Sequence, residues 1–358
     1  MATYHTTHDA SGGGNGTYAD PWTLQEAADS AIAGDVVKVH NTGTYSLSSA
    51  LDFDTHSGSR SSPISFIGVG PAEADSPEMA FIAQTASGAD GFNVIQSHLY
   101  FESLSLQGAS SADGWSVGGD HVTCVRCRAH GAGQAGLLGQ TADHLTLVGC
   151  EFHSNGRQGV SLGGGSLHRA TLLGCAAHNN AWAGIHLERA TALLWRCASY
   201  GNSHGVRVQE LEADAGVVVL GCTLLDNGSD GIEVADINAD AALLVANCIG
   251  VRNGAYGMDA ASAVHAVLFG NLWPSSGDDA NTAGNTNNIV VLGNPDDVLK
   301  PNLDAGQVAA FVDPTVCYPD LRLGAGSDAM GAAWPGCLPI TDLCTTTTAA
   351  PTTTTSGA

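Results

Sequence analysis

CEFHSNGRQGVSL, residues 150–162, contains a cysteine, an asparagine five residues later and a glycine four residues after that. The same order returns in four stretches downstream, and a version without the asparagine precedes them upstream. Successive cysteines of this series are 22 to 26 residues apart: they are Cys127, Cys150, Cys175, Cys197, Cys222 and Cys248. A recurring period of this length is typical of repeat architectures, in which each unit packs against its neighbours.

The repeats consist of strand-like segments only. Each holds short apolar runs, such as HLTLVGCEF at 144–152, separated by turns that contain asparagine and glycine, and none has a helical pattern of useful length. Strand-only repeats of this period are typical of the right-handed parallel β-helix, and the consensus of leucine-rich repeats is absent. The expected fold class is therefore all-β, with a single right-handed parallel β-helix solenoid.

Equivalent positions of the repeats are expected to form ladders, because successive coils stack about 4.8 Å apart. The cysteines should form an inward ladder of free thiols, since cysteine packs as a small apolar residue and in-register neighbours do not readily reach disulfide geometry. Asparagine tolerates the left-handed conformation and its stacked amides pair along the axis, which predicts a turn ladder of Asn155, Asn180, Asn202, Asn227 and Asn253. Glycines should supply the bend into the next strand at Gly136, Gly159, Gly184, Gly205, Gly231 and Gly257.

The two ends of the chain differ from the repeats. TLQEAADSAIAG at 23–34 predicts an amphipathic helix, with a capping box between Thr23 and Glu26 and Gly34 at its end. Strands are expected at 35–40, 64–70 and 98–108. The organisation predicted is a cap helix with first coils at 1–95, repeat coils at 96–292, distal coils with a C-terminal cap at 293–340, and a disordered Thr/Pro tail at 341–358.

Composition excludes some classes of function. The formal net charge is −23 and the chain has two lysines, Lys38 and Lys300, which argues against nucleic-acid binding. No apolar stretch is long enough to span a membrane, and MATYHTTHDASGGG at 1–14 lacks the features of a secretory signal. Three further cysteines lie outside the repeats, and whether they form disulfides is open: Cys317, Cys337 and Cys344.

The pattern C-x-F-x-x-N-x-x-x-G-V-x-L resembles the pectate-lyase-like right-handed β-helix superfamily. The opening segments TLQEAADSAIAGD, VVKVHNTGTY and PISFIG share this resemblance, and PDLRLGAGSDAMGAAWPG at 319–336 resembles the run with which family members finish their last coils. The resemblance covers roughly residues 14–335. It implies the fold and a helix that shields the first coil, but family members include lyases, hydrolases, viral spikes and inert surface proteins.

Family active sites are not matched by this sequence. Family lyases that act on uronates use a basic residue as proton abstractor, often beside calcium, whereas the central repeats contain no lysine and their arginines form no ladder across adjacent repeats. The N-T-D, D-D and G-H-G motifs of the polygalacturonase branch are absent too.

The best site candidate is a polar column two residues after the repeat glycines. Side chains alternate inward and outward along a strand, so this position should face solvent: it holds Leu138, Ser161, His186, Arg207, Glu233 and Asp259. Glu233 and Asp259 could act as an acid–base pair on a glycosidic bond, and Ser161, His186 and Arg207 could bind a glycan. The alternative is an ordinary polar surface on which Arg207 and Glu233 form an ion pair.

Two further groups of residues are candidate ligand sites. His130, His153, His178 and Tyr200 stand three residues after successive cysteines and could either bind a metal or stack as a structural ladder. The acidic stretches near 226–240 could bind calcium or form solvated turns, and calcium is the single cofactor considered. The oxygen ligands would come from Asp226, Asp230, Asp236 and Asp240.

The preferred hypothesis is a non-enzymatic structural or adhesive β-helix on a virion or extracellular surface, such as a phage appendage or decoration. Its expected partners are other virion or surface proteins, a second copy of the chain in a homo-oligomer such as a trimer, and a polysaccharide. The first alternative is a polysaccharide-degrading hydrolase or lyase of the pectate-lyase-like superfamily. The second is a glycan-binding module without catalysis.

Overall fold

A computed structural model describes residues 1–71, 78–108, 110–163, 168–212, 215–235 and 241–259, with the strands at 265–269, 280–281 and 289–291 and residue 271 beyond them. The expected distal coils at 293–340, the tail at 341–358 and the cysteines at 317, 337 and 344 lie outside the described residues. Within the described part, no helix combines the length and apolar character that crossing a membrane requires.

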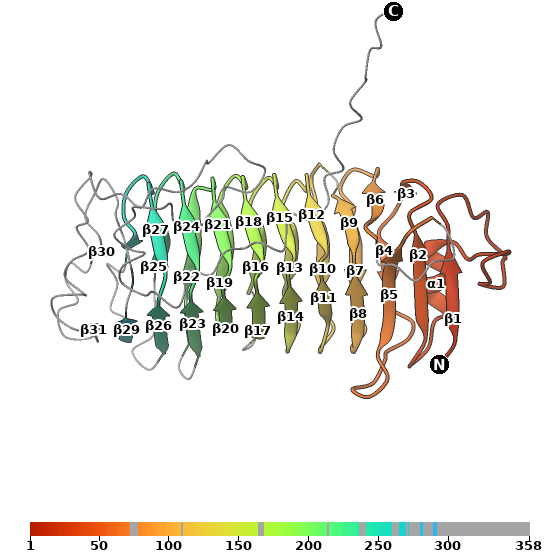
Figure 1. Ribbon diagram of the computed structural model, residues 1–358, viewed down its shortest axis with the longest axis horizontal. Helices are drawn as coiled ribbons and strands as arrows, with labels where there is room; N and C mark the ends of the chain where they lie inside the picture. The colour runs from red at the N-terminus through yellow and green to blue at the C-terminus, as the bar shows by residue number, and fades with distance from the viewer. Residues whose placement is uncertain are drawn as a thin grey trace, which may run out of the picture.

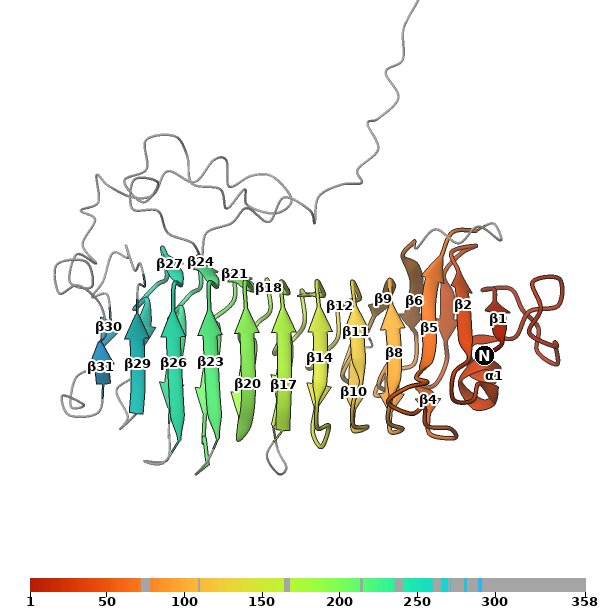
Figure 2. The same cartoon turned by 60° about the horizontal axis from the view of Figure 1, so that its bottom comes forward.

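The chain forms a parallel β-solenoid whose coils lie side by side along one axis (Figures 1 and 2), as the repeats predicted. Every strand pairs in parallel with the equivalent strand of the next coil, so three sheets run along the solenoid. The 12-stranded sheet contains β1 (Thr3–Thr6), β2 (Val36–His40), β5 (Ile64–Val69), β8 (Leu99–Glu102), β11 (Thr123–Val125), β14 (Leu145–Val148), β17 (His168–Leu173), β20 (Ala190–Trp195), β23 (Gly216–Leu220), β26 (Ala242–Ala246), β29 (His265–Phe269) and β31 (Ile289–Val291).

The other two sheets complete each coil. The ten-stranded sheet contains β4 (Leu51–Phe53), β7 (Phe92–Val94), β10 (Trp115–Val117), β13 (Leu137–Gly139), β16 (Val160–Leu162), β19 (Ala183–Glu188), β22 (His204–Gln209), β25 (Ile232–Ala235), β28 (Met258–Asp259) and β30 (Ala280–Asn281). The nine-stranded sheet contains β3 (Tyr45–Leu47), β6 (Ala80–Gln84), β9 (Leu104–Gln107), β12 (Arg128–His130), β15 (Glu151–His153), β18 (Ala176–His178), β21 (Ala198–Tyr200), β24 (Thr223–Leu225) and β27 (Ile249–Val251).

The predicted cap helix is present but shorter than expected. The helix α1 (Leu24–Ser30) begins with the capping box of Thr23 and Glu26 and ends at Ala31 in an extended conformation, so Gly34 lies in the following turn. Its Gln25 side chain bonds both the N–H and the carbonyl of Asp52 on β4. The helix thereby occupies the hydrogen-bonding edge of the first strand of the ten-stranded sheet, an edge that is otherwise open to pairing.

The cysteine ladder is confirmed. All six repeat cysteines are buried free thiols, and Cys124, which the repeat pattern omits, joins them in the core. Their thiols donate to backbone carbonyls, as from Cys150 Sγ to Cys124 O at 3.3 Å. Burial raises the pKa of the Cys127, Cys150 and Cys175 thiols above the ordinary range, which keeps them protonated and unreactive.

The asparagine ladder is also confirmed, and its bonds run from coil to coil. Asn180 Oδ1 accepts from the backbone N–H of Asn155 at 3.1 Å and from its Nδ2 at 2.9 Å, and the Nδ2 of Asn180 donates in turn to Asn202 at 3.0 Å. The same side-chain bond joins Asn202 to Asn227 and Asn227 to Asn253. The expected left-handed conformation belongs instead to the preceding residue, at Ser154, Asn179, Gly201, Asp226 and Arg252.

The repeat glycines serve a purpose different from the one predicted. None of the five with described surroundings has a positive φ; each leaves room for the asparagine of the next coil. A Cβ atom at Gly159 would lie 2.9 Å from Asn180 Nδ2 and 2.6 Å from the Gly184 carbonyl oxygen, and Gly136, Gly184, Gly205 and Gly231 are similarly crowded. Glycine is required here because the next coil approaches closely, and not because the backbone needs a positive φ.

The histidine column stacks as a ladder, with ring centroids 5.0 Å apart between His130 and His153 and between His153 and His178, and 4.6 Å between His178 and Tyr200. A second stack that the sequence analysis did not identify joins His98, His121 and His144. Among the described residues, no group of three His, Cys, Asp or Glu side chains is arranged to hold a metal ion. The structural interpretation of the histidine column is therefore the better one.

Replacing Asn202 by alanine should lower the free energy of unfolding by roughly 2–4 kcal/mol, because two buried donors of Asn180 lose their acceptor. Chemical denaturation monitored by circular dichroism measures this change. Ser203→Ala, at the neighbouring half-exposed position, is the control and should have little effect. Equal stability of wild type and Asn202→Ala would contradict the role of the ladder.

Titration of the denatured, non-reduced chain with a thiol reagent should find at least the seven free cysteines of the core. The native chain should react far more slowly, because these thiols are buried. Four or fewer reactive groups after denaturation would show that the ladder contains disulfides.

Candidate functional site

The polar column of the ten-stranded sheet is in register. The strand pairing places Leu138 beside Ser161, Ser161 beside His186, His186 beside Arg207, Arg207 beside Glu233 and Glu233 beside Asp259. The column thus unites the five residues named as catalytic or glycan-binding candidates on neighbouring strands. The side chains of Ser161, His186, Arg207 and Glu233 point away from the core, because the residues on either side of each are buried, and Asp259 follows the buried Met258.

Solvent exposure along this column is lower than predicted. Ser161 is 8% exposed and His186 is 4% exposed, although their strand positions face outward. The Trp182 ring from the turn before β19 lies over the column, with its centroid 5.0 Å from that of His186. The expectation of a fully solvent-facing column is therefore wrong at these two positions: Trp182 lies beside His186, and Ser161 Oγ lies 3.4 Å from His186 Nδ1.

A compact charged cluster surrounds Glu233. Its Oε2 atom lies 3.0 Å from Arg207 Nε and 3.3 Å from His204 Nδ1, and the same histidine nitrogen lies 3.4 Å from Asp230 Oδ2. The Arg207 and Glu233 side chains are 20% and 22% exposed, so the predicted ion pair is confirmed but is largely shielded from water. We call Trp182, His186, His204, Arg207, Asp230 and Glu233 the column cluster.

Two guanidinium groups lie over Trp182. Arg207 Cζ is 4.7 Å and Arg157 Cζ is 5.5 Å from the ring centroid, distances at which a cation is attracted by the ring. The indole therefore holds Arg207 against the sheet, while Arg157 keeps an exposed position at the edge of the cluster.

Four buried polar atoms of the column cluster have no well-aligned hydrogen-bond partner: His186 Nε2, His204 Nδ1, Arg207 Nε and Glu233 Oε2. The charged groups are close, but their angles do not make good hydrogen bonds. Unsatisfied buried polar atoms are rare in folded proteins and concentrate where a ligand or a catalytic step uses them. The cluster can therefore offer both donors and acceptors to a polar molecule.

Protonation in the cluster favours fixed states at neutral pH. Burial lowers the pKa of His186 to about 4, assisted by the positive charges of Arg207 and Arg157, so its imidazole is neutral. Burial alone would raise the pKa of Asp230, but the groups of His204, Ser229 and the Tyr256 N–H that approach its carboxylate outweigh burial and lower it. A general acid or base works best with a pKa near the working pH, a condition that His186 and Asp230 do not meet.

The four aspartates considered for calcium do not form one site in the described part of the chain. Asp226 faces outward and pairs with Arg252 through two contacts of 2.6 Å, whereas Asp230 belongs to the column cluster. Asp236 and Asp240 lie outside the described residues.

The sequence analysis missed His204, Trp182 and Arg157 because they belong to the turn and not to the strand. One signal was available: His204 stands directly before the repeat glycine Gly205, as Asp230 stands before Gly231. Strand pairing places His204 beside Ala183, and its ring lies near Asp230 and Glu233.

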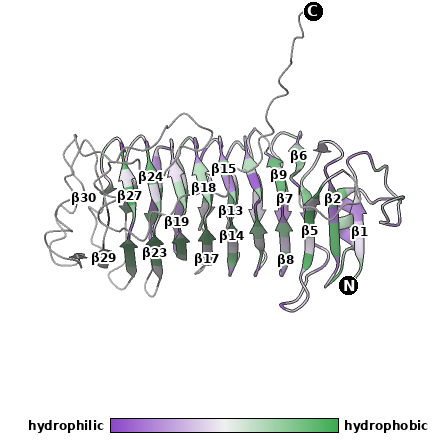
Figure 3. Cartoon of the chain, in the orientation of Figure 1, coloured by the Kyte–Doolittle hydropathy of each residue, from purple (hydrophilic) through white to green (hydrophobic). Residues whose placement is uncertain are grey.

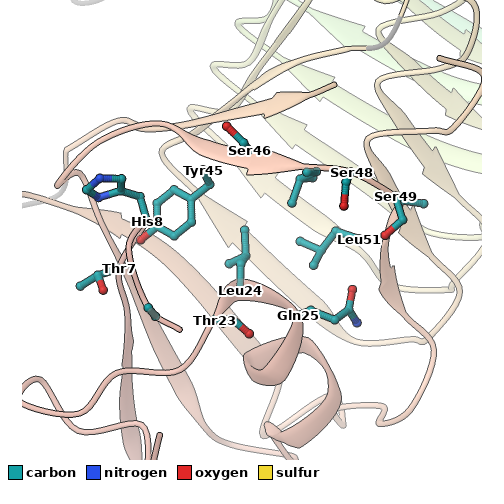
Figure 4. A pocket seen from close by; sticks show the side chains of 13 residues that line it. Thr7, His8, Thr23, Leu24, Gln25, Tyr45, Ser46, Ser48, Ser49 and Leu51 are labelled. Carbon is teal, nitrogen blue, oxygen red and sulfur yellow. The ribbon is translucent and has the colours of Figure 1, made fainter. Parts of the chain in front are cut away.

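A second hollow lies at the capped end of the solenoid. It has a volume of about 250 Å³ and lies between α1 and the first strands of the two smaller sheets (Figure 4). Hydroxyl groups of Thr7, Ser46 and Ser48 and the apolar side chains of Leu24 and Leu51 line it. Charged side chains are absent from its described lining, so the column cluster is the better functional candidate.

Residues 4–270 match the family model of the Pel9A-like right-handed β-helix region. This match covers more than half of the chain. The chain belongs to the Pel9A-like right-handed β-helix family. The resemblance inferred from the repeats and the opening segments is thereby confirmed. No curated protein sequence matches the chain.

Solved structures show how widely this fold is used. Pectate lyase Pel9A superposes with a TM-score of 0.67 at 16% identity, covering 92% of this chain and 90% of its own. The alginate lyase from Paenibacillus sp. str. FPU-7 gives 0.59 at 15% identity, with coverage of 82% and 98%. ORF18 of Geobacillus virus E2 gives 0.54 at 14% identity, with coverage of 80% and 60%. At these identities the likeness establishes the fold of this Pel9A-like chain and not an activity.

Lowering the pH should destabilise the protein between pH 6.5 and about 4. An unfolded imidazole takes up a proton below 6.5, whereas the folded His186 resists protonation down to about 4, so the unfolded state binds more protons in this window. His186→Gln should reduce the loss of thermal stability across the window, measured by calorimetry at several pH values. His56→Gln, at an exposed position, is the control and should leave the pH profile as in wild type.

Proposed function

We propose that this protein is a non-enzymatic β-helical structural or adhesive protein, displayed on a virus particle or another extracellular surface, which binds a polysaccharide at the column cluster. The observation that carries the proposal is the set of four buried polar atoms without aligned partners beside Trp182. A ligand that supplies hydroxyl groups could satisfy all four, because a hydroxyl both donates and accepts hydrogen bonds.

The chemistry of the cluster suits a saccharide. Arg207 and His204 offer nitrogen groups, Glu233 and Asp230 offer carboxylate acceptors, and the two guanidinium groups of Arg207 and Arg157 offset the two carboxylates locally despite the net charge of −23. Sugar rings present hydroxyls in several directions, and recognition needs a few polar groups fixed in place. The ion pairs and the parallel strands hold these groups in register along the axis, which suits an extended chain more than a compact ligand.

Protonation in the cluster argues for binding in preference to catalysis. A glycosidase needs one carboxylic acid with a raised pKa to protonate the leaving oxygen. Asp230 has a lowered pKa, which is the opposite of what a general acid needs, and the Glu233 carboxylate is already engaged by Arg207 and His204. His186 is a weak base because its pKa lies at about 4.

Surface display is supported by the sequence outside the solenoid. Residues 345–358, TTTTAAPTTTTSGA, have the composition of a tether without core-forming residues. The fold itself occurs in a viral protein, ORF18 of Geobacillus virus E2. The expected surroundings are therefore other virion or surface proteins.

The alternative is a polysaccharide-degrading enzyme, since the structural neighbours include a pectate lyase and an alginate lyase. Glu233 and Asp259 are register partners on adjacent strands, as a pair of catalytic carboxylates would require. Under this alternative, a residue other than lysine would have to abstract the proton from the uronate, because the repeat coils at 96–292 contain no lysine.

A glycan array probed with the purified wild-type chain should identify a bound polysaccharide. The double variant Arg207→Ala/Glu233→Ala should bind it at least ~10-fold more weakly, a loss of about 1.4 kcal/mol. The matched control is Arg169→Ala/Asp143→Ala, which removes an ion pair of similar length from another face and should bind as wild type does. No wild-type binding, or equal binding by both double variants, would contradict the proposed site.

The same panel of polysaccharides should then be incubated with the chain, with and without calcium, and assayed for shortened products. No depolymerisation is expected. Turnover that is abolished by Glu233→Gln or Asp259→Asn would replace the proposal with the enzymatic alternative.

A further inference from the structure

The outer face of the 12-stranded sheet carries rows of apolar side chains, whereas the columns described on the other two sheets are polar or histidine-rich. Strand pairing aligns one continuous row of large apolar side chains across five coils: Val125, Val148, Leu173, Trp195 and Leu220. In the adjacent row of outward positions, three aligned residues are also apolar: Leu193, Val218 and Leu244. All eight point outward and are partly exposed, and Trp195 is 45% exposed. We call these eight residues the apolar face; Figure 2 shows the sheet that carries it.

The strands of this sheet have the sequence of strands covered on both sides. ALLW at 192–195, VVVL at 217–220 and ALLVA at 242–246 are continuous apolar runs, and β23 is largely green in Figure 3. Continuous apolar runs characterise parallel sheets that are buried on both faces, whereas half-exposed sheets alternate. Contiguous apolar patches on a surface mark interaction sites more often than scattered ones do.

We propose that the apolar face is a self-association surface and that its partner is a second copy of this chain. Two identical solenoids have the same distance between coils, so ridges and grooves on the two faces match along the whole contact. A partner without this repeat distance would match only locally. The inference is independent of the proposed function, because the column cluster belongs to a different sheet.

The size and the edges of the face fit this partner. Each outward residue covers about 4.8 Å along the axis and ~7 Å along the strand, so the eight residues of the apolar face form an apolar centre of roughly 270 Å². A stable interface buries about 800 Å² on each partner, with an apolar centre and a polar rim. Ion pairs at the edges provide a rim of balanced charge: Arg169 with Asp143, Arg189 with Glu210 and Arg126 with Glu102.

Trp195 is the expected centre of the interface. It lies inside the longer row, between Leu173 and Leu220, and the Arg196 guanidinium lies 5.0 Å from its ring. Tryptophan and arginine are the residues that most often dominate the affinity of protein interfaces, and they cluster near the interface centre.

Analytical ultracentrifugation of the full chain at micromolar concentration should show a dimer or a trimer. Trp195→Glu should weaken self-association by at least about 30-fold, the effect of losing one dominant interface residue. The matched control is Phe81→Glu on the nine-stranded sheet, since Phe81 is 43% exposed and lies outside the apolar face. Wild type and the control should sediment alike.

A second variant shows whether a loss of self-association comes from the interface or from misfolding of Trp195→Glu. Leu193→Thr/Val218→Thr introduces the residue that already stands in this row on three preceding coils, Thr123, Thr146 and Thr171, so the fold should be kept. It should also weaken assembly, with an unchanged circular dichroism spectrum. A monomeric wild type overturns the inference, whether other residues of the chain or a foreign protein cover the face. So does an oligomer that persists in both folded variants.

Discussion

In the central coils, each ladder asparagine occupies the space that a Cβ atom would need at the repeat glycine of the preceding coil. Asn180 Nδ2 would lie 2.9 Å from a Cβ atom at Gly159, and the same crowding recurs at the other four ladder asparagines. The amide can enter because the glycine has no side chain, and once there it bonds the asparagine of the next coil. The two residues depend on each other, which explains why they recur together in the sequence.

This contact fixes the register of the central coils, and register determines which residues align on the surface. Because each strand pairs in parallel with its equivalent one coil away, each outward position becomes a column. The three faces then differ only through the residues placed in those columns: polar and charged on the ten-stranded sheet, stacked imidazoles on the nine-stranded sheet, and apolar rows on the 12-stranded sheet. One scaffold thereby carries a candidate binding site and a candidate interface without interference.

The column cluster shows how a solenoid can form a shielded site without a long loop. A single indole from a turn, Trp182, lies beside His186, and the cations Arg207 and Arg157 lie over it. Burial and nearby positive charge then lower the pKa of His186. The shielding that strengthens polar interactions within the cluster also makes its imidazole a poor base, so binding and catalysis place opposite demands on this geometry.

The sequence by itself determined the architecture. Its period predicted the parallel solenoid, the buried cysteines, the asparagine ladder and the capping box of Thr23, because these depend on local residue types repeated at fixed spacing. It also predicted the strand column from Ser161 to Asp259, since alternation along a strand needs no tertiary knowledge. Three predictions were wrong: the length of the helix, the reason for the repeat glycines and the position of the left-handed residue in the turn. Each of these features depends on contacts between coils.

Only the tertiary structure decided which outward residues meet water. Ser161 and His186 occupy outward positions yet are buried, and the turn before β19 contributes Trp182, whose ring lies beside His186. His204 enters the cluster from the turn before β22, and its proximity to Asp230 and Glu233 is visible only in the folded chain. The apolar face has the same cause: single apolar residues far apart in sequence form a continuous surface only when the coils stack in register.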